Sequence, residues 1–99
     1  MPVDVRQFRV VGVVQGVGFR WFVRETARAL DVAGWVRNES DGSVLVMAAG
    51  ANEVLAQLEA ALRIGPPGAH VERLEVTPGV AQPKGLPRPF QVVRPERDA

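Results

Sequence analysis

The stretch that decides the fold is residues 5–30, VRQFRVVGVVQGVGFRWFVRETARAL, which passes from a strand pattern to a helix pattern across a glycine turn. From Val5 to Val14 the side chains alternate between two partly apolar faces, which predicts a β-strand. One face carries Arg6, Phe8, Val10 and Gly12, and the other carries Val5, Gln7, Arg9, Val11 and Val13. From Trp21 to Leu30 the apolar positions change to three- and four-residue spacing, which predicts a helix that faces a core. Its apolar side consists of Phe19, Phe22, Val23, Thr26, Ala27 and Leu30.

A hairpin is predicted after the first helix. Val32–Asn38 and Ser43–Ala49 are the expected strands, joined by Glu39-Ser40-Asp41-Gly42. Asp41-Gly42 is a strong hairpin-turn sequence because both residues tolerate the left-handed backbone that such turns need. Asn38 is therefore expected to end a strand.

The second half of the chain predicts one more helix and two strands. Asn52 is expected to cap a helix that stops at Gly65-Pro66-Pro67-Gly68. The apolar stripe of this helix comprises Val54, Leu55, Leu58, Ala61 and Leu62. A strand is predicted from His70 to Val76, a proline-broken loop from Thr77 to Pro89, and a short final strand from Phe90 to Val93.

The order strand, helix, strand, strand, helix, strand is the split βαβ pattern of ferredoxin-like sandwiches. We therefore expect an α+β fold, an α/β sandwich of βαββαβ topology with a short extra C-terminal strand. Two helices should cover one face of a mainly antiparallel sheet. A single domain over residues 1–99 is long enough to bury an adequate core without staples.

Composition excludes several functional classes. The formal net charge is only +1, so no overall basic field favours binding to nucleic acid or to an anionic membrane. With no cysteine and one histidine, the chain has no disulfide, no thiolate nucleophile and no predicted metal site. Neither a secretory signal nor a membrane-spanning stretch is visible, and we expect a cytoplasmic monomer.

The turn Gln15-Gly16-Val17-Gly18-Phe19-Arg20 is predicted to bind an anion. Its glycines let backbone N–H groups point to one side, where the free amides and the positive dipole end of the helix also point. No Ser, Thr, Asp or Asn caps those amides ahead of Trp21, and a cation at this helix end costs about 0.3–1 kcal/mol unless an anion is bound. The alternative is a tight turn with an exposed Arg20, because short Gly-x-Gly matches are weak evidence. Arg24 and Arg28, on the same side of the helix, are expected to form a solvated flank.

Three other chemistries each lack a required residue. A dinucleotide site needs a third glycine where Trp21 stands, and a Walker-type loop needs a Gly-Lys pair, whereas the sole lysine is Lys84. Ser-His-Asp catalysis would need His70, which we expect to be a surface residue at the start of a strand. Backbone amides, one guanidinium and one carboxamide remain. These groups suffice for hydrolysis of an activated phosphate compound, where positioning and electrostatic stabilisation supply most of the catalysis.

Several motifs, in the same order along the chain, resemble the acylphosphatase family. They are Val14-Gln15-Gly16-Val17-Gly18-Phe19-Arg20, Gly34-Trp35-Val36-Arg37-Asn38, Asp41-Gly42-Ser43-Val44, Gly65-Pro66-Pro67 and the final Phe90 strand. The resemblance spans nearly the whole chain. It implies hydrolysis of a small acyl phosphate, a carboxyl–phosphate anhydride, to carboxylate and inorganic phosphate, with a ferredoxin-like fold and no cofactor.

The resemblance also implies roles for individual residues. Arg20 matches the phosphate-binding arginine, whose planar fork can hold two phosphoryl oxygens. The backbone amides expected to hold others are those of Gln15, Gly16, Val17, Gly18, Phe19 and Arg20. Asn38 matches the asparagine that positions the attacking water, since an amide both donates and accepts without charge. Without the resemblance, Asn38 would be interpreted as a strand-end residue that satisfies the turn.

Some positions are expected to be structural or depart from the family pattern. Trp35 and Phe19 are interpreted as core or hairpin packing, and Arg37 is expected to be exposed because it alternates away from Asn38. Val13 stands where a basic residue is common in the family, and Arg94 to Ala99 end the chain without a closing aromatic. These departures bear on how strongly the loop attracts anions and how firmly the last strand is held.

Two other functions stay open. An acylphosphatase-like module can be non-catalytic or can belong to a larger carbamoyl-phosphate-handling machine, as in hydrogenase maturation proteins. Ferredoxin-like sandwiches also bind RNA or small effectors. An RNA-binding sheet needs aromatics on its open face, whereas Phe8 is the only aromatic of the first strand and shares its face with Val10.

Overall fold

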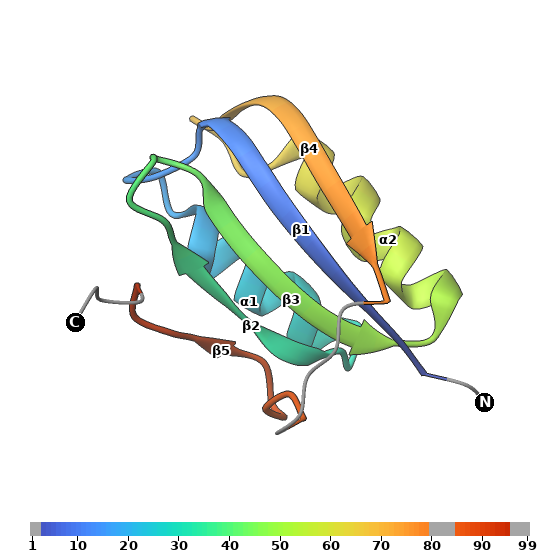
Figure 1. Ribbon diagram of the computed structural model, residues 1–99. Coiled ribbons are helices and arrows are strands. Elements are labelled where there is room, and N and C mark those ends of the chain that lie inside the picture. Colours follow the sequence, from blue (N-terminus) through green and yellow to red (C-terminus); the bar gives the residue numbers. More distant parts are fainter. Residues whose placement is uncertain (1–2, 80–84, 96–99) are drawn as a thin grey trace.

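The computed structural model describes residues 3–79 and 85–95. Its elements follow one another as predicted: a strand, a helix, two strands, a helix and two strands (Figure 1). They are β1 (Asp4–Val13), α1 (Phe19–Ala29), β2 (Ala33–Asn38), β3 (Val44–Gly50), α2 (Asn52–Ile64), β4 (His70–Pro78) and β5 (Gln91–Val92).

The strands form one five-stranded sheet in the order β4-β1-β3-β2-β5. All neighbours are antiparallel except β2 and β5, which are parallel. Both helices lie on the same face of the sheet (Figure 1). The predicted ferredoxin-like sandwich with a short extra C-terminal strand is therefore confirmed.

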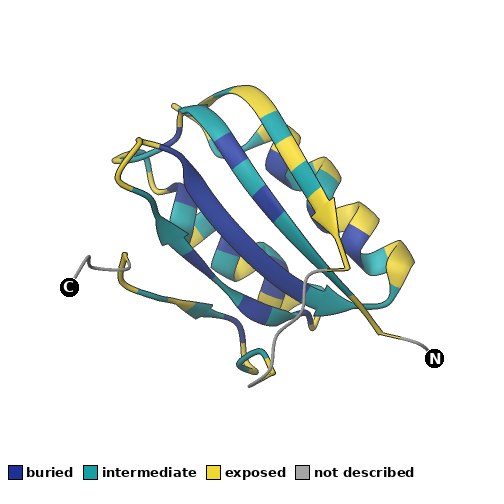
Figure 2. Cartoon of the chain, in the orientation of Figure 1, coloured by how far each residue is buried: buried dark blue, intermediate teal, exposed yellow. Residues whose placement is uncertain are grey.

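The core lies between the helices and this face of the sheet. Figure 2 shows β3 as a nearly continuous buried strand beside the partly buried β1. Phe8, Phe19 and Phe90 are fully or almost fully buried there, so the prediction that Phe19 packs in the core is confirmed. Because Phe8 lies under the helices, it is not an aromatic of the open sheet face.

The opposite face of the sheet is covered by long side chains rather than by helices. Leu45 and Met47 of β3 are buried there, opposite Arg37 and Trp35 of β2 in the strand register. The Arg37 guanidinium stacks 4.7 Å from the centre of the Trp35 ring and donates a 3.1 Å hydrogen bond to Glu39. The expectation of hairpin packing holds for Trp35. The expectation that Arg37 is exposed is wrong, because stacking and pairing leave only 19% of its side chain accessible.

Helix α2 begins differently from the prediction. Asn52 is its first helical residue, and the capping position belongs to Ala51, which has extended backbone and makes no side-chain cap. The Ala51 carbonyl accepts the first helical hydrogen bonds, from Val54 and Leu55 at 3.0 Å. The Asn52 side chain instead accepts a hydrogen bond from Arg6 of β1. The side-chain oxygen of Asn52, which was predicted to cap the helix, therefore bonds to Arg6 of β1 instead.

Strand β5 is attached to β2 and α1 by backbone and side-chain hydrogen bonds. The N–H groups of Gly34 and Val93 donate to Pro87 and Val36 at 2.8 and 2.9 Å. Arg28 of α1 donates from Nε to the Phe90 carbonyl at 2.9 Å, so it has a structural contact beyond the predicted solvated flank. Of the predicted loop from Thr77 to Pro89, β4 takes the first two residues, and residues 80–84, including Lys84, lie outside the described residues. Residues 96–99 of the predicted tail lie outside them as well.

Phe90, which directly precedes β5, should hold this strand to the core more strongly than Val92 does. We expect Phe90→Ala to lower the free energy of unfolding by about 3–5 kcal/mol, because it removes a fully buried aromatic and leaves a cavity. Val92→Ala, at a site that is 38% exposed, is the matched control and should cost less than about 1 kcal/mol. Urea unfolding followed by circular dichroism measures both, and equal losses would contradict the role given to Phe90.

Candidate active site

Helix α1 begins without a cap. Gly18 occupies the capping position with left-handed backbone, makes no side-chain hydrogen bond, and is followed by a first turn that contains no acidic residue. The first hydrogen bond of the helix runs from the Phe22 N–H to the Gly18 carbonyl at 3.0 Å. The N–H groups of Phe19, Arg20 and Trp21 therefore have no acceptor within the helix. The predicted set of free amides is present, with the helix starting two residues earlier than expected.

The glycines of this turn are needed for their conformation. Gly16 and Gly18 have φ of 77° and 76°, and a Cβ at either position would meet nothing within 4 Å. A side chain there would have room but would strain the backbone. Glycine therefore allows the chain to turn twice and present its amides next to the helix start.

Phe19 fixes the position of this turn. Its ring is buried in the core and packs edge-on against Phe22, with ring centres 6.0 Å apart. It also lies so close to Gly65 that a Cβ there would come within 2.9 Å of the ring. Gly65 has φ of +71°, so glycine is required at this position both for space and for conformation. The anchoring of Phe19 accounts physically for the Gly65 motif at the end of α2.

A pocket of about 270 Å³ opens between the start of α1 and the end of β2. It is lined by Val14, Gly16, Gly18, Phe19, Arg20, Trp21, Asn38 and Val92. The two predicted catalytic residues, Arg20 and Asn38, thus border the same pocket although they are separated in sequence. Gly16, Gly18 and Phe19 of the predicted phosphate-binding loop border it too.

Arg20 is the only charged residue among those that line this pocket. Its side chain is half-buried, and it makes no hydrogen bond or ion pair within residues 3–79 and 85–95. A guanidinium beside free helix amides produces a local positive potential, which a bound anion would satisfy.

Asn38 presents a buried oxygen to the same region. Its Oδ1 is inaccessible and has no hydrogen-bond partner in the part of the chain that the structure describes. Most buried polar atoms in proteins are paired, and an unpaired one costs free energy. An unpaired carboxamide oxygen beside a pocket is typical of a group that binds a water molecule or a ligand.

The side chain of Gln15 has a different place from the rest of the predicted loop. Its Nε2 donates to the backbone carbonyls of Glu39 and Ser43 at 2.8 and 2.9 Å, which ties the loop to the β2–β3 hairpin. Gln15 does not line the 270 Å³ pocket, and Val17 packs against the core instead. The sequence predicts that the backbone amides of both residues bind phosphate. Their side chains do not line the pocket.

The hairpin turn that follows Asn38 is held by Asp41. Its Oδ1 accepts from the Ser43 hydroxyl at 2.6 Å and from the Ser43 N–H at 2.9 Å. Arg9 reaches the same group, with 2.9 Å to the Ser43 hydroxyl and 3.5 Å to Asp41. These hydrogen bonds, above all the one from the Ser43 side chain, lower the pKa of Asp41 below its usual value of 3.8. The charged form of Asp41 therefore stabilises the turn that positions Asn38.

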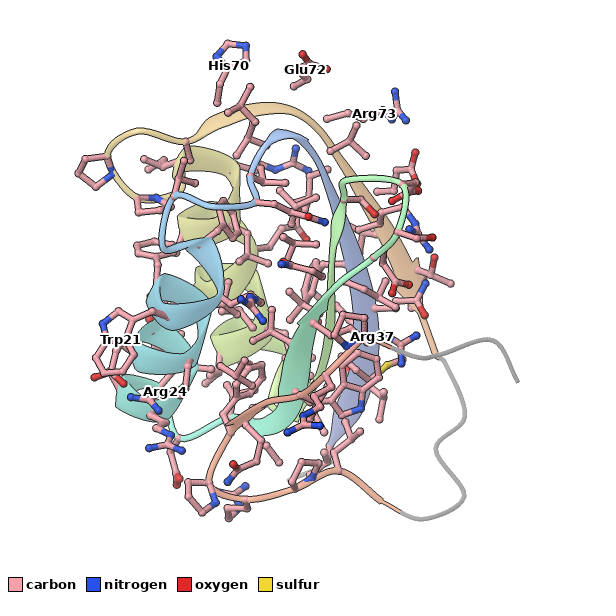
Figure 3. The ribbon with its side chains drawn as sticks, turned by 90° about the vertical axis from the view of Figure 1, so that its left-hand side faces the viewer. Trp21, Arg24, Arg37, His70, Glu72 and Arg73 are labelled. Atoms are coloured by element: carbon pink, nitrogen blue, oxygen red, sulfur yellow. The ribbon has the colours of Figure 1, made fainter. Side chains whose placement is uncertain are left out.

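Sequence reasoning missed three residues that line the pocket: Val14, Trp21 and Val92. One of them could have been found, because Trp21 lies outside the apolar stripe of its helix and directly follows Arg20. His70 is exposed at the start of β4 and points away from the protein, as expected (Figure 3). Neither α1 nor α2 has the length and apolar character of a membrane span. Within the described ranges, no three His, Cys, Asp or Glu side chains are grouped so as to hold a metal ion.

The fold and the pocket together define a ferredoxin-like protein whose first helix has an uncapped start that borders a pocket. The sequence matches the acylphosphatase family over residues 6–91. It is 48% identical to the acylphosphatase of Rhizobium etli over 84 residues, which cover 85% of this chain and 87% of that one. The chain therefore belongs to the acylphosphatase family, and with it to the hydrolases that cleave acyl phosphates.

Solved structures show the same likeness. The acylphosphatase of Bacillus subtilis superposes with a TM-score of 0.84 and 37% identity, covering 91% of this chain and 98% of that one. T. kodakarensis HypF superposes with a TM-score of 0.79 and 29% identity. The match covers 92% of this chain but 12% of HypF, so the likeness concerns one part of a much larger protein.

The two hydrogen bonds of Gln15 should matter for turnover more than for substrate affinity. We expect Gln15→Met, which keeps the size but loses the donor, to lower kcat about 10-fold and to change KM little, because the loop and Asn38 lose their alignment. Steady-state hydrolysis of benzoyl phosphate measures this split. Gln57→Met, at an exposed position of α2, is the matched control. A rise in KM with unchanged kcat would contradict a positioning role.

The lowered pKa of Asp41 predicts how the stability of the hairpin depends on pH. A carboxylate whose pKa is lower in the folded protein than in the unfolded chain stabilises the folded protein. This stabilisation is complete at a pH above the unfolded pKa and is lost as the pH falls through the folded pKa. Asp41→Asn should therefore reduce the free energy of unfolding at pH 7, and the difference from the parent protein should shrink steadily below about pH 4. Urea unfolding across this range measures it, with Glu72→Gln on exposed β4 as the control. A difference that is constant with pH would contradict the assignment.

Proposed function

We propose that Arg20 and the backbone amides of residues 15–20 bind the phosphoryl group of an acyl phosphate, while Asn38 positions the water that attacks it. One observation carries this proposal: Arg20, the uncapped start of α1 and Asn38 all border one pocket. Among the described residues, neither the Arg20 guanidinium nor the buried Asn38 Oδ1 has a partner. The family resemblance of these residues supports the same roles.

Arg20 suits the phosphoryl group by shape and charge. Its guanidinium offers parallel donors that match two phosphoryl oxygens, and the free amides of the first helical turn can donate to the remaining one. As the phosphorus–oxygen bond to the leaving group lengthens, charge spreads over these oxygens, and fixed donors stabilise it without reorganising. Lysine would supply the charge but not the paired geometry.

The neutral carboxamide of Asn38 can position the attacking water. Its Oδ1 can accept a hydrogen bond from the water, which directs an oxygen lone pair toward phosphorus. A carboxylate at this position would repel the substrate phosphate, whereas an amide is neutral.

The reaction then needs only the groups present in the pocket. The water oxygen forms a bond to phosphorus, the bond from phosphorus to the carboxylate oxygen breaks, and the carboxylate leaves with the electron pair. Among residues 3–79 and 85–95, no carboxylate or imidazole lines the pocket. We therefore assign one proton of the water to a phosphoryl oxygen of the substrate. The other proton stays on the attacking oxygen, so that dihydrogen phosphate leaves. Positioning and electrostatic stabilisation carry the catalysis.

The remaining expectations are part of the same proposal. We propose one catalytic domain over residues 1–99 that works as a cytoplasmic monomer on a small acyl phosphate, without cofactor, nucleic acid or membrane. Gel filtration with light scattering tests the monomer, and the assay below tests the cofactor.

A second candidate function is a module that acts with a partner protein. The likeness to 12% of T. kodakarensis HypF favours this alternative, because the same fold occurs there within a larger chain. In that case the isolated chain would hydrolyse acyl phosphates slowly, and a pulldown would recover a specific partner.

Arg20 and Asn38 should both be essential, and in different ways. We expect Arg20→Ala to lower kcat/KM for benzoyl phosphate by about 100- to 1,000-fold and Arg20→Lys to recover little, because lysine lacks the paired donors. Asn38→Ala should lower kcat by about 100-fold and leave the inhibition constant of inorganic phosphate nearly unchanged, because the phosphate site stays intact. Phosphate release in steady state measures these values.

Two controls make this assay decisive. Arg63→Ala, at an exposed arginine of α2, should leave the rate unchanged. A chelator in the buffer should also leave it unchanged if no metal takes part. Full activity of folded Arg20→Ala and Asn38→Ala would overturn the proposed site.

A further inference from the structure

The pocket has an apolar side that the binding of phosphate does not use. Trp21 of α1 and Val92 of β5 border it, and both are large apolar side chains left exposed, by 60% and 38%. An exposed tryptophan is costly in solvent and is typical of a surface that contacts a ligand. Val14 and Phe19 are the other apolar residues of the lining.

We propose that Trp21 and Val92 form the acyl-group subsite of this enzyme and select apolar acyl groups, above all aromatic ones. This inference rests on the proposed function, because the phosphoryl group at Arg20 sets where the acyl group lies. Arg20 and Trp21 border the same pocket, so the acyl group of a substrate held by the guanidinium would share that pocket with the indole ring.

The indole ring is held ready for this contact. The Arg24 guanidinium lies 4.0 Å from the ring centre and is itself paired with Glu25 at 3.1 Å. Figure 3 shows Trp21 and Arg24 together on the outer side of α1. The guanidinium covers one face of the ring, which restricts the side chain and leaves the other face for a ligand. A pre-oriented aromatic loses little entropy on binding.

The chemistry of the lining sets the preference. Of the described residues that line the pocket, only Arg20, Asn38 and the Trp21 N–H have side-chain groups that can donate or accept a hydrogen bond. A charged or polar acyl group would lose hydration there without gaining partners. The volume is also sufficient, because a cavity of about 150 Å³ holds benzene and this one measures about 270 Å³.

The test compares two substrates that share the phosphate and differ in the acyl group. We expect Trp21→Ala to lower kcat/KM for benzoyl phosphate about 3- to 10-fold and to change that for acetyl phosphate less than about 2-fold. Trp21→Phe should keep most of the benzoyl phosphate rate, and Val92→Ala should lower it in the same sense as Trp21→Ala but less. The inhibition constant of inorganic phosphate should stay unchanged in every variant. Ile64→Ala, at an apolar side chain that is 78% exposed on α2, is the matched control.

The possible outcomes separate the subsite from the catalytic site. Equal losses on both substrates, or no loss on either, would overturn the acyl subsite while leaving the roles of Arg20 and Asn38 in place. A parent protein that hydrolyses neither substrate would overturn the proposed function and the subsite together. Misfolding of Trp21→Ala is checked by circular dichroism, and Val92→Ala tests the same prediction from another element.

Discussion

The geometry of the pocket at the start of α1 depends on the packing of Phe19 in the core. Its ring is fixed in the core between α1 and the end of α2, where only glycine at position 65 leaves room for it. Because Arg20 is the next residue on the same helical turn, its direction from the core is set by that anchor. The free amides of the turn are set by it as well. Core packing and the geometry of the proposed phosphate site thus have the same origin.

A second set of contacts brings Asn38 to this turn. Gln15 spans from the loop to two carbonyls of the β2–β3 hairpin, and Asp41 and Ser43 close the hairpin tightly. Two segments that are distant in sequence are therefore joined by hydrogen bonds from buried or half-buried groups, which are stronger than those in water. The relative positions of the turn and Asn38 therefore do not depend on flexible surface side chains alone.

The sequence predicted the elements well because each has a clear period and a clear stop. The strand and helix boundaries move by two residues at most in the fold that the structure shows, and the pairing of Arg20 with Asn38 came from family motifs. Long polar side chains could not be placed in this way. Gln15, Arg28 and Asn52 have partners 24 to 62 residues away, and only the folded chain shows which groups lie within reach. Val92 was missed for a related reason, because it reaches the pocket from a different element than Arg20.

An NMR titration of the ¹⁵N-labelled protein with inorganic phosphate tests whether the turn at residues 15–20, with Arg20, binds the phosphoryl group. We expect the largest amide shifts at Gly16, Gly18, Phe19 and Arg20, and we expect them to disappear in folded Arg20→Ala. Shifts confined to the arginines of the open sheet face, or shifts that persist in Arg20→Ala, would contradict this expectation.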